Sequence, residues 1–268
     1  MDRIKNIGSN VSVNGLAFIR GDSKVSKLVK AVLIIILIVF AISIIKKAVT
    51  GYKKYKDGSP WILKGTKDGR KRLIVLQDPG KLGSITIKRS ENEYGGLEFT
   101  YMFWMNIDDW AYKYGQWKHI LHKGNESSWP LRGPGVWLHP KENAMRIYMN
   151  TFKNIGEKVD IDNLPLNKWF HVAIAVRQKF LDIYVNGNIV KRHELEGLPK
   201  QNSGDLYLNA FRGFGGFLSN IRYFDYYVSF AELDSALLTG PVESGCIDSN
   251  EVPPYFTPNW WSNSSSSE

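Results

Sequence analysis

The chain is poor in cysteine, with Cys246 alone among its 268 residues. A single cysteine cannot form an intramolecular disulfide, which fits a reducing compartment, although disulfide-free extracellular domains are also common. We expect Cys246 to be a bystander rather than a nucleophile. With 43% apolar residues, the chain is long enough to bury one sizeable core.

Acidic residues are scarce in the first part of the chain. Residues 1–72 hold 16 Lys/Arg and 4 Asp/Glu, a net charge of +12, whereas residues 73–268 hold 19 and 22, a net charge of −3. The overall charge of +9 therefore comes from the N-terminal segment. A nucleic-acid-binding domain needs a basic face on its folded unit, so we expect no nucleic-acid partner.

No charged residue occurs between Ala31 and Ile45. As a helix this run spans about 22 Å, and its extension to residues 28–49 spans about 33 Å, enough for the roughly 30 Å hydrocarbon core of a bilayer. Four lysines flank the run and can reach the lipid headgroups: Lys27, Lys30, Lys46 and Lys47. The sequence predicts one transmembrane helix over residues 28–49. The alternative of a buried helix in a soluble core is disfavoured, because the rest of the sequence predicts no helices that could cover it. A cleaved signal peptide is disfavoured because the polar segment before the apolar run is too long.

The basic flanks predict an orientation. Within fifteen residues of the apolar run there are four Lys/Arg on the N-terminal side and five on the C-terminal side, and the whole flanks hold six and ten. By the positive-inside rule, the C-terminal domain is expected to face the cytosol. Contact of these lysines with anionic headgroups is a further hypothesis, with ordinary topogenic charge as its alternative.

Three segments lack the periodicity of a folded domain. They are a basic N-terminal segment (1–27), a Lys/Gly-rich linker or stalk (50–72) and a Pro/Ser-rich tail (241–268). We expect the linker to hold the next domain just off the bilayer, with docking of Trp61 and Ile62 on that domain as the alternative. The tail is not expected to fold alone, and Trp260-Trp261 is a candidate anchor within it.

From residue 73 to residue 240 the pattern changes to short runs of period two, as in LEFTYMFWMNI. Short strands separated by Gly, Pro, Asn and Asp, without a long amphipathic helix, predict an all-β domain. The pair Asn186-Gly187 predicts a hairpin with a type I′ turn. Ser229 and Glu232 predict a capping box on a short helix.

The order of these runs resembles a known family. It matches at Phe103-Trp104, Trp169–Ala173, Ile183–Gly187 and Gly216–Phe224, within residues 85–238. This order is similar to concanavalin A-like lectin/glucanase domains of the laminin-G and pentraxin-like branch. The resemblance implies a jelly-roll sandwich of two antiparallel sheets. Such a domain behind a lone N-terminal anchor also resembles membrane proteins of large DNA viruses.

Catalytic carboxylates are not evident. Glucanases of the family carry E-x-D-x-E on a strand, where alternation places a nucleophile and an acid on one face. The nearest match here is VDIDN, with Asp160 and Asp162 on one side and Leu164 at the third position. We therefore expect no enzyme activity and interpret the two aspartates as solvated. A membrane-tethered glycoside hydrolase is the least favoured alternative.

Metal ligands are also not evident. His119 and His122 are three residues apart, so on a regular strand they point to opposite faces and are poor co-ligands. Asn220 stands where an acidic residue often lies in the closing strand of the family. We expect no cofactor. A loop calcium site is the alternative, with three candidate ligands: Asp108, Asp109 and Asp205.

Aromatic residues are dense in DDWAYKYGQWKHILHKGNESSWP. Five of them are candidate contacts for a partner: Trp110, Tyr112, Tyr114, Trp117 and Trp129. Aromatic side chains are common at protein interfaces, so we rank a protein partner first and a glycan second.

The sequence therefore predicts a non-enzymatic, single-pass membrane protein. Its sandwich is expected to contact a protein assembly, such as a viral capsid or other membrane proteins. A cell-surface lectin is the main alternative. The sequons at Asn125 and Asn263 separate the two, because only lumenal exposure leads to their glycosylation.

Overall fold

The computed structural model describes residues 24–90 and 96–242. The chain divides into two units between residues 56 and 57, and each is described by itself. The predicted basic segment before residue 24 and the predicted tail after residue 242 lie outside the described residues. So do Cys246, Trp260-Trp261 and Asn263.

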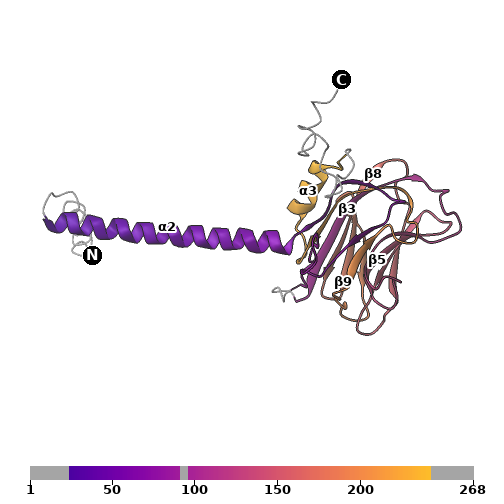
Figure 1. Ribbon diagram of the computed structural model, residues 1–268, viewed down its shortest axis with the longest axis horizontal. Coiled ribbons are helices and arrows are strands. Elements are labelled where there is room, and N and C mark those ends of the chain that lie inside the picture. The colour runs from indigo at the N-terminus through magenta and orange to yellow at the C-terminus, as the bar shows by residue number, and fades with distance from the viewer. Residues whose placement is uncertain (1–23, 91–95, 243–268) are drawn as a thin grey trace, which may run out of the picture. The chain divides into compact units, whose positions relative to one another are not determined.

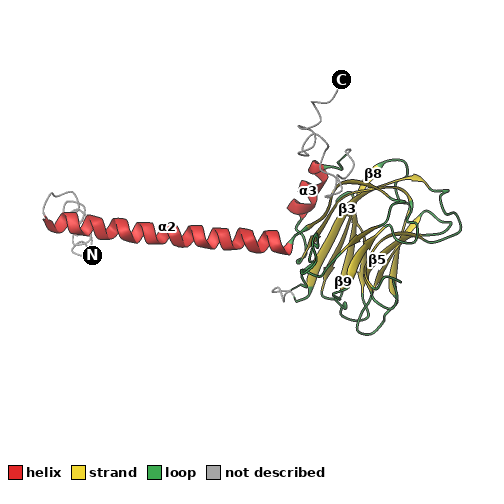
Figure 2. Ribbon diagram, viewed as in Figure 1, coloured by secondary structure: helices red, strands yellow, loops and turns green. Residues whose placement is uncertain are grey.

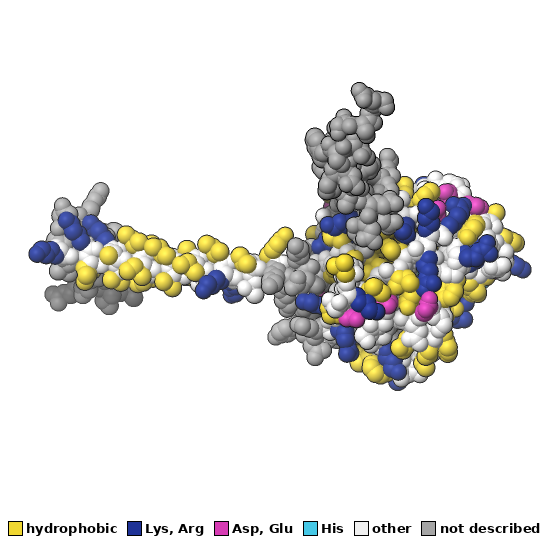
Figure 3. All heavy atoms as spheres, in the orientation of Figure 1, with side chains coloured by type: hydrophobic (Ala, Val, Ile, Leu, Met, Phe, Trp, Pro, Cys, Tyr) yellow, Lys and Arg dark blue, Asp and Glu magenta, His cyan; other side chains and the backbone are white. Residues whose placement is uncertain are grey.

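Helix α2 (Lys24–Gly58) contains the apolar run. Its segment Ser26–Tyr52 has 27 residues, a mean hydropathy of 3.2 and no burial within the structure. Figure 3 shows hydrophobic side chains along the helix, with Lys and Arg towards its ends. Its length and composition make α2 a candidate membrane span or signal sequence.

The prediction of a linker over residues 50–72 is corrected by the structure. Helix α2 continues to Gly58, and strand β1 (Trp61–Asp68) lies at the edge of a sheet, paired with β12 (Gly215–Phe224). The side chains of Ile62 and Leu63 are buried in the core. The prediction was wrong because the run WIL is too short to show a period, and its partner strand lies some 150 residues further along the chain.

Two six-stranded antiparallel sheets form the sandwich, as predicted (Figures 1 and 2). Sheet A has the order β1, β12, β3 (Glu98–Asp109), β8 (Trp169–Arg177), β9 (Phe180–Val185), β10 (Asn188–Glu194). Sheet B has the order β2 (Leu73–Val75), β11 (Asp205–Leu208), β4 (Lys118–Gly124), β5 (Arg132–Leu138), β6 (Ala144–Met149), β7 (Glu157–Asp162).

The core lies between the sheets and follows from strand alternation. In β3 the predicted inner residues Phe99, Tyr101, Phe103 and Met105 are all buried. They face apolar side chains of sheet B such as Ile120, and together they form one continuous cluster. Burial of these large side chains supplies the main stabilisation, at roughly 25 cal/mol per Å² of apolar surface.

The predicted hairpin and the predicted capping box are both present. Asn186 and Gly187 have φ values of 49° and 78°, which a type I′ turn requires at both positions. Helix α3 (Phe230–Thr239) starts at Ser229, whose side chain accepts from the backbone of Glu232, and the Glu232 side chain reaches back. On α3, Leu233 packs with Met102, Ala173, Phe224 and Val228 on the outer face of sheet A.

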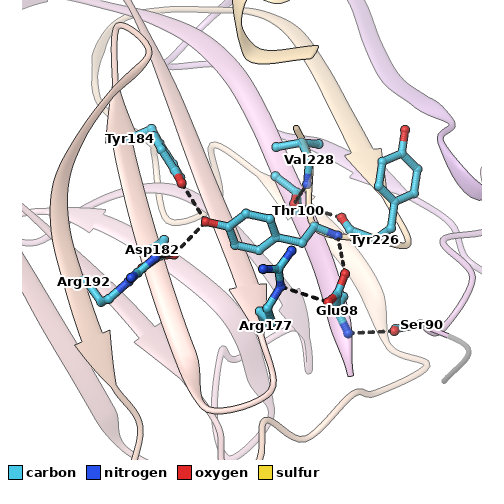
Figure 4. Close-up of polar contacts among 10 residues, drawn as sticks. Ser90, Glu98, Thr100, Arg177, Asp182, Tyr184, Arg192, Tyr226 and Val228 are labelled. Atoms are coloured by element: carbon cyan, nitrogen blue, oxygen red, sulfur yellow. Dashed lines mark hydrogen bonds and ion pairs between the residues drawn. The ribbon is translucent and has the colours of Figure 1, made fainter. Parts of the chain in front are cut away.

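A polar network fastens the segment before α3 to the same face (Figure 4). The Tyr227 hydroxyl donates to Asp182 at 2.6 Å, and Asp182 also forms a two-point ion pair with Arg192. The backbone N–H of Tyr227 donates to Glu98, which pairs with Arg177. Strands β3, β8, β9 and β10 are thereby connected to one segment, so part of the outer face of sheet A is occupied by the chain's own residues.

Candidate functional site on the outer face of sheet B

Alternation along sheet B places a second set of side chains on its outer face. In β5, Val136 and Leu138 belong to the core, whereas Trp137 lies on the other side, opposite Arg146 of β6 and His119 of β4. Ring contacts, cation–π contacts and, for Arg146, strand pairing with Trp137 connect these residues into one surface, which we call the aromatic–arginine layer. It consists of Arg72, His119, His122, Arg132, Trp137, Arg146, Tyr148 and Tyr207.

Trp137 is the centre of this layer. Its ring lies 4.9 Å from that of His119 and 5.4 Å from that of Tyr148, and only 6% of the residue is exposed. The indole lies across Gly135, where a Cβ atom would come within 2.5 Å of the ring carbon Cζ3. The glycine therefore provides the space that lets a large ring lie flat against the sheet.

Three arginines stack on the rings, and they differ in their charge partners. Arg146 lies over Trp117 and forms a two-point ion pair with Asp160, at 2.6 and 2.7 Å. Arg72 lies over Tyr207 and pairs with Glu126 at 2.5 Å.

Arg132 is the exception. Its guanidinium lies 3.5 Å from the centre of the Tyr148 ring and 5.5 Å from the rings of Trp129 and Trp137. Within the described part of the chain, no carboxylate forms an ion pair with Arg132, and its buried Nε has no hydrogen-bond partner. The layer therefore holds one stacked cation that is available to a partner.

The prediction that His119 and His122 point to opposite faces is wrong. An irregularity in the pairing of β4 with β5, between His119 and Leu121, shifts the alternation by one residue. Both rings then lie on the outer face, with the Nε2 of His119 at 2.6 Å from the Nδ1 of His122. A β-bulge of this kind re-aims a side chain and cannot be read from spacing alone.

The two imidazoles form a hydrogen-bonded chain. The N–H of Ala210 donates to Nδ1 of His119 at 2.9 Å, so His119 carries its proton on Nε2 and donates to His122. His122 in turn donates from Nε2 to the carbonyl of Asn125 at 2.8 Å. All four ring nitrogens are occupied, which leaves no lone pair for a metal.

Burial keeps both rings neutral. Desolvation lowers the pKa of His119 well below its usual value, and the adjacent His122 lowers it further. Desolvation lowers the pKa of His122 to about 4, helped by the charges of Arg132 and Arg72. The pair thus connects the loops at Asn125 and Ala210 without adding charge to the layer.

The five predicted aromatic contacts do not form one cluster. Trp117 and Trp129 border the layer at opposite ends of β4, a strand of seven residues that spans about 23 Å. Their exposed fractions are 36% and 55%, and Tyr114 is exposed at 62%. Trp110 instead packs against the core beside Lys118, and the Tyr112 hydroxyl donates to the carbonyl of Arg212.

The predicted polar candidates have structural partners. Asp109 pairs with Arg70, and Asp205 accepts from the backbone N–H of Gln77. Asn220 accepts from the N–H of Gly65 and donates to the carbonyl of Gly240. In residues 24–90 and 96–242, no group of three or more His, Cys, Asp or Glu side chains could hold a metal ion.

Sequence reasoning missed most of the layer, although a signal for it was present. In GVWLHP, MRIYMN and DLYLNA the apolar residues of the core alternate with Trp137, Arg146, Tyr148 and Tyr207. Comparison of these three runs would have shown aromatic and arginine side chains on their second face. Whether the aromatic and arginine side chains of different runs touch each other depends on the order of the strands in the sheet, and the three runs do not specify that order.

The fold and the sequence now identify the family. Residues 80–234, more than half of the chain, match the family model of the concanavalin A-like lectin/glucanases superfamily. The chain belongs to this superfamily. No curated protein matches the chain.

Among solved structures, the chain is similar to binding domains of botulinum neurotoxins. The receptor-binding domain of botulinum neurotoxin D is 13% identical, with a TM-score of 0.48, over 68% of this chain and 53% of that one. The serotype G binding domain is 15% identical, with a TM-score of 0.46, over 65% and 46%. The serotype D ligand-binding domain in complex with N-acetylneuraminic acid is 13% identical, with a TM-score of 0.47, over 70% and 52%. This chain thus spans about half the length of these structures.

Proposed function

We propose that this protein is a membrane-anchored, non-enzymatic binding protein whose aromatic–arginine layer contacts a protein assembly. In the proposed arrangement α2 spans the bilayer and the sandwich faces the cytosol or an enclosed protein shell. The single observation that carries the proposal is the continuous layer of stacked rings and guanidinium groups on the outer face of sheet B.

The composition of this layer supports a protein partner. Trp, Tyr and Arg are the residues that dominate binding energy at protein interfaces. Stacking on Tyr148 and Trp117 holds Arg132 and Arg146 in place before a partner arrives, which lowers the entropy cost of binding. Arg132 lacks a carboxylate partner among the described residues, so the proposed partner presents an acidic group to it.

The state of the candidate acids supports a role without catalysis. Asp160 is held in a two-point ion pair by Arg146, whose hydrogen bonds lower the pKa of Asp160 below its usual value. A carboxylate that stays ionised cannot serve as the general acid of a glycosidase. Asp162 is exposed on the same strand, and the third position of the pattern is the buried Leu164, which has no carboxylate.

A protein shell next to a membrane, such as a viral capsid, is the proposed type of assembly. A short anchored sandwich is suited to link a bilayer to such a shell. The proposal predicts that the sequon at Asn125 stays unglycosylated in the native setting. A mass shift removed by a glycosidase would contradict the cytosolic orientation.

Photo-crosslinking of the full-length protein in its native membrane tests the proposal. A photoreactive phenylalanine analogue replaces Trp129 or Phe211, which border the layer and are exposed at 55% and 46%. The matched control places the same analogue at Phe230 on α3, exposed at 75% on the opposite side of the sandwich. We expect a defined protein adduct from positions 129 and 211 only. Equal adducts at all three positions would contradict the proposal.

Glycan binding is the alternative, and the exposed indole of Trp129 is the observation that favours it. A sugar ring can stack on such a face with the Arg132 guanidinium alongside. Incubation of the detergent-solubilised protein with a glycan array separates the two functions. Binding that Trp129→Ala abolishes, without a protein adduct from position 129, would favour the lectin.

A further inference from the structure

A small pocket lies between the two sheets at one end of the sandwich. It is partly open to solvent, and its cavity volume is about 20 Å³. Its walls are Phe99, Tyr101 and Tyr223 from sheet A, Lys123 and Gly133 from sheet B, and the segments 87–89 and 200–202. The pocket is separate from the aromatic–arginine layer, because its walls face the inside of the sandwich.

Every charged side chain in these walls is a cation: Lys88, Arg89, Lys123 and Lys200. The sandwich from β1 onwards, residues 61–242, holds 24 Lys/Arg and 19 Asp/Glu, a net charge of +5, and these four cations lie together in the walls of one pocket. Lys123 and Lys200 are the decisive pair, because the contacts of both ammonium groups are defined.

Lys123 is a buried cation without an ion pair among the described residues, and the negative charge of Asp205 acts on it without contact. It is 4% exposed, and its ammonium group donates to the carbonyls of Asn202 and Gly204 at 2.9 and 2.7 Å. An ammonium group has three protons, so one remains for a ligand. Burial of a charge without a partner is unfavourable, and desolvation lowers the pKa of Lys123 to about 8.

The neighbouring residues complete the set of donors. The Oε1 of Gln201 accepts from the backbone N–H of Ser90 at 2.9 Å, which orients its amide so that Nε2 is the donor end. Lys200 lies 5.3 Å from the centre of the Phe152 ring, a contact that leaves its ammonium protons available. Donors from β4 and from the segment 200–202 thus surround one space, as an anion with several acceptor oxygens requires.

We propose that this pocket binds a phosphate-class anion through Lys123, Lys200 and Gln201. The anion is either the phosphate of a lipid headgroup or a soluble phosphate. The backbone N–H of Tyr223, a wall residue, donates to the carbonyl of Pro60, which follows the apolar segment ending at Tyr52 by eight residues in the sequence. The lipid source rests on the proposed membrane anchoring, whereas the anion site itself does not.

Calorimetric titration of the full-length protein in a neutral detergent with sodium phosphate, at constant ionic strength, tests the site. We expect saturable binding that Lys200→Met weakens at least tenfold. The control Lys191→Met changes an exposed lysine on β10, at the far edge of sheet A, and should leave the affinity unchanged. Binding should also weaken between pH 8 and pH 9.5 as Lys123 loses its proton. Equal affinity of the Lys200→Met and unchanged proteins would overturn the site.

Reconstitution in nanodiscs separates the two sources. Phosphatidic acid in phosphatidylcholine offers a phosphate monoester, and phosphatidylserine at equal surface charge is the control lipid. Thermal stabilisation by phosphatidic acid that Lys200→Met removes identifies a lipid headgroup, whereas a response to free phosphate alone identifies a soluble anion. No response to either would overturn the inference. The proposed function would stand if the adducts from positions 129 and 211 persisted.

Discussion

The two outer faces of the sandwich are built from similar antiparallel strands but differ in what covers them. On sheet A, α3 and the segment before it pack on Met102 and Phe224, and Tyr227 is bonded to Asp182 and Glu98. On sheet B, the ring and cation–π contacts of Trp137 among the described residues are with side chains of the aromatic–arginine layer, such as His119, Tyr148 and Arg132. We therefore expect the outer face of sheet A to contribute mainly to stability and the outer face of sheet B to contribute to stability and to binding.

The largest expected effect is the removal of the central indole. Trp137→Ala should destabilise the protein by about 3–5 kcal/mol, because it deletes a large buried ring, and should also abolish the partner adduct. Leu233→Ala on α3 is the matched change on sheet A. It should lower the free energy of unfolding by about 2–5 kcal/mol but leave partner binding normal at low temperature, where the variant is folded. Denaturant unfolding of the full-length protein in micelles, followed by crosslinking, checks both. Loss of the adduct in both variants would remove the distinction between the faces.

Acid pH should lower the free energy of unfolding through one buried histidine on each sheet. Burial depresses the folded-state pKa of His122 on sheet B and of His171 on sheet A to about 4 each. The unfolded chain takes up protons near pH 6.5, so stability is complete above that pH and falls as the pH decreases towards 4, by about 3 kcal/mol per histidine. For His122→Gln and His171→Gln, the free energy of unfolding should depend less on pH between pH 4 and pH 7 than it does for the unchanged protein. A dependence unchanged in both variants would contradict this assignment.

Two glycines allow a smaller comparison. An alanine at position 135 would place its Cβ 2.5 Å from the rigid indole of Trp137, with a cost of about 1–3 kcal/mol and weaker partner binding. An alanine at Gly187 would adopt a φ of +78° and meet the flexible end of Leu237, with a cost of about 1–2 kcal/mol and unchanged binding. Denaturant unfolding measures the stability of the two glycine variants, and the yield of the crosslinked adduct measures their binding. Equal loss of binding would show that the layer is not the contact.

The smallest effect is expected at the exposed ion pair of the layer. Asp160→Asn removes the partner of Arg146, and since such pairs contribute less than about 1 kcal/mol, stability should barely change. The same variant tests the remaining enzyme hypothesis. Turnover of a β-glucan by the unchanged protein, abolished by Asp160→Asn, would show that the domain is a hydrolase.

The sequence by itself determined the features that depend on neighbouring residues. Alternation defined the inner face of β3, the pair Asn186-Gly187 defined a hairpin, and Ser229 with Glu232 defined the start of α3. The uncharged run Ala31–Ile45 defined α2 in the same way. Each of these patterns is local, so a few side chains are enough to specify the structure.

Only the tertiary structure decided which distant residues meet. The pairing of β1 with β12, the bulge that joins His119 to His122 and the stacking of Arg132 on Tyr148 all depend on strand order and register. The pocket around Lys123 depends in addition on the distance between the two sheets. Such contacts join segments far apart in the chain, and the free energy that selects them comes from the packing of the whole sandwich.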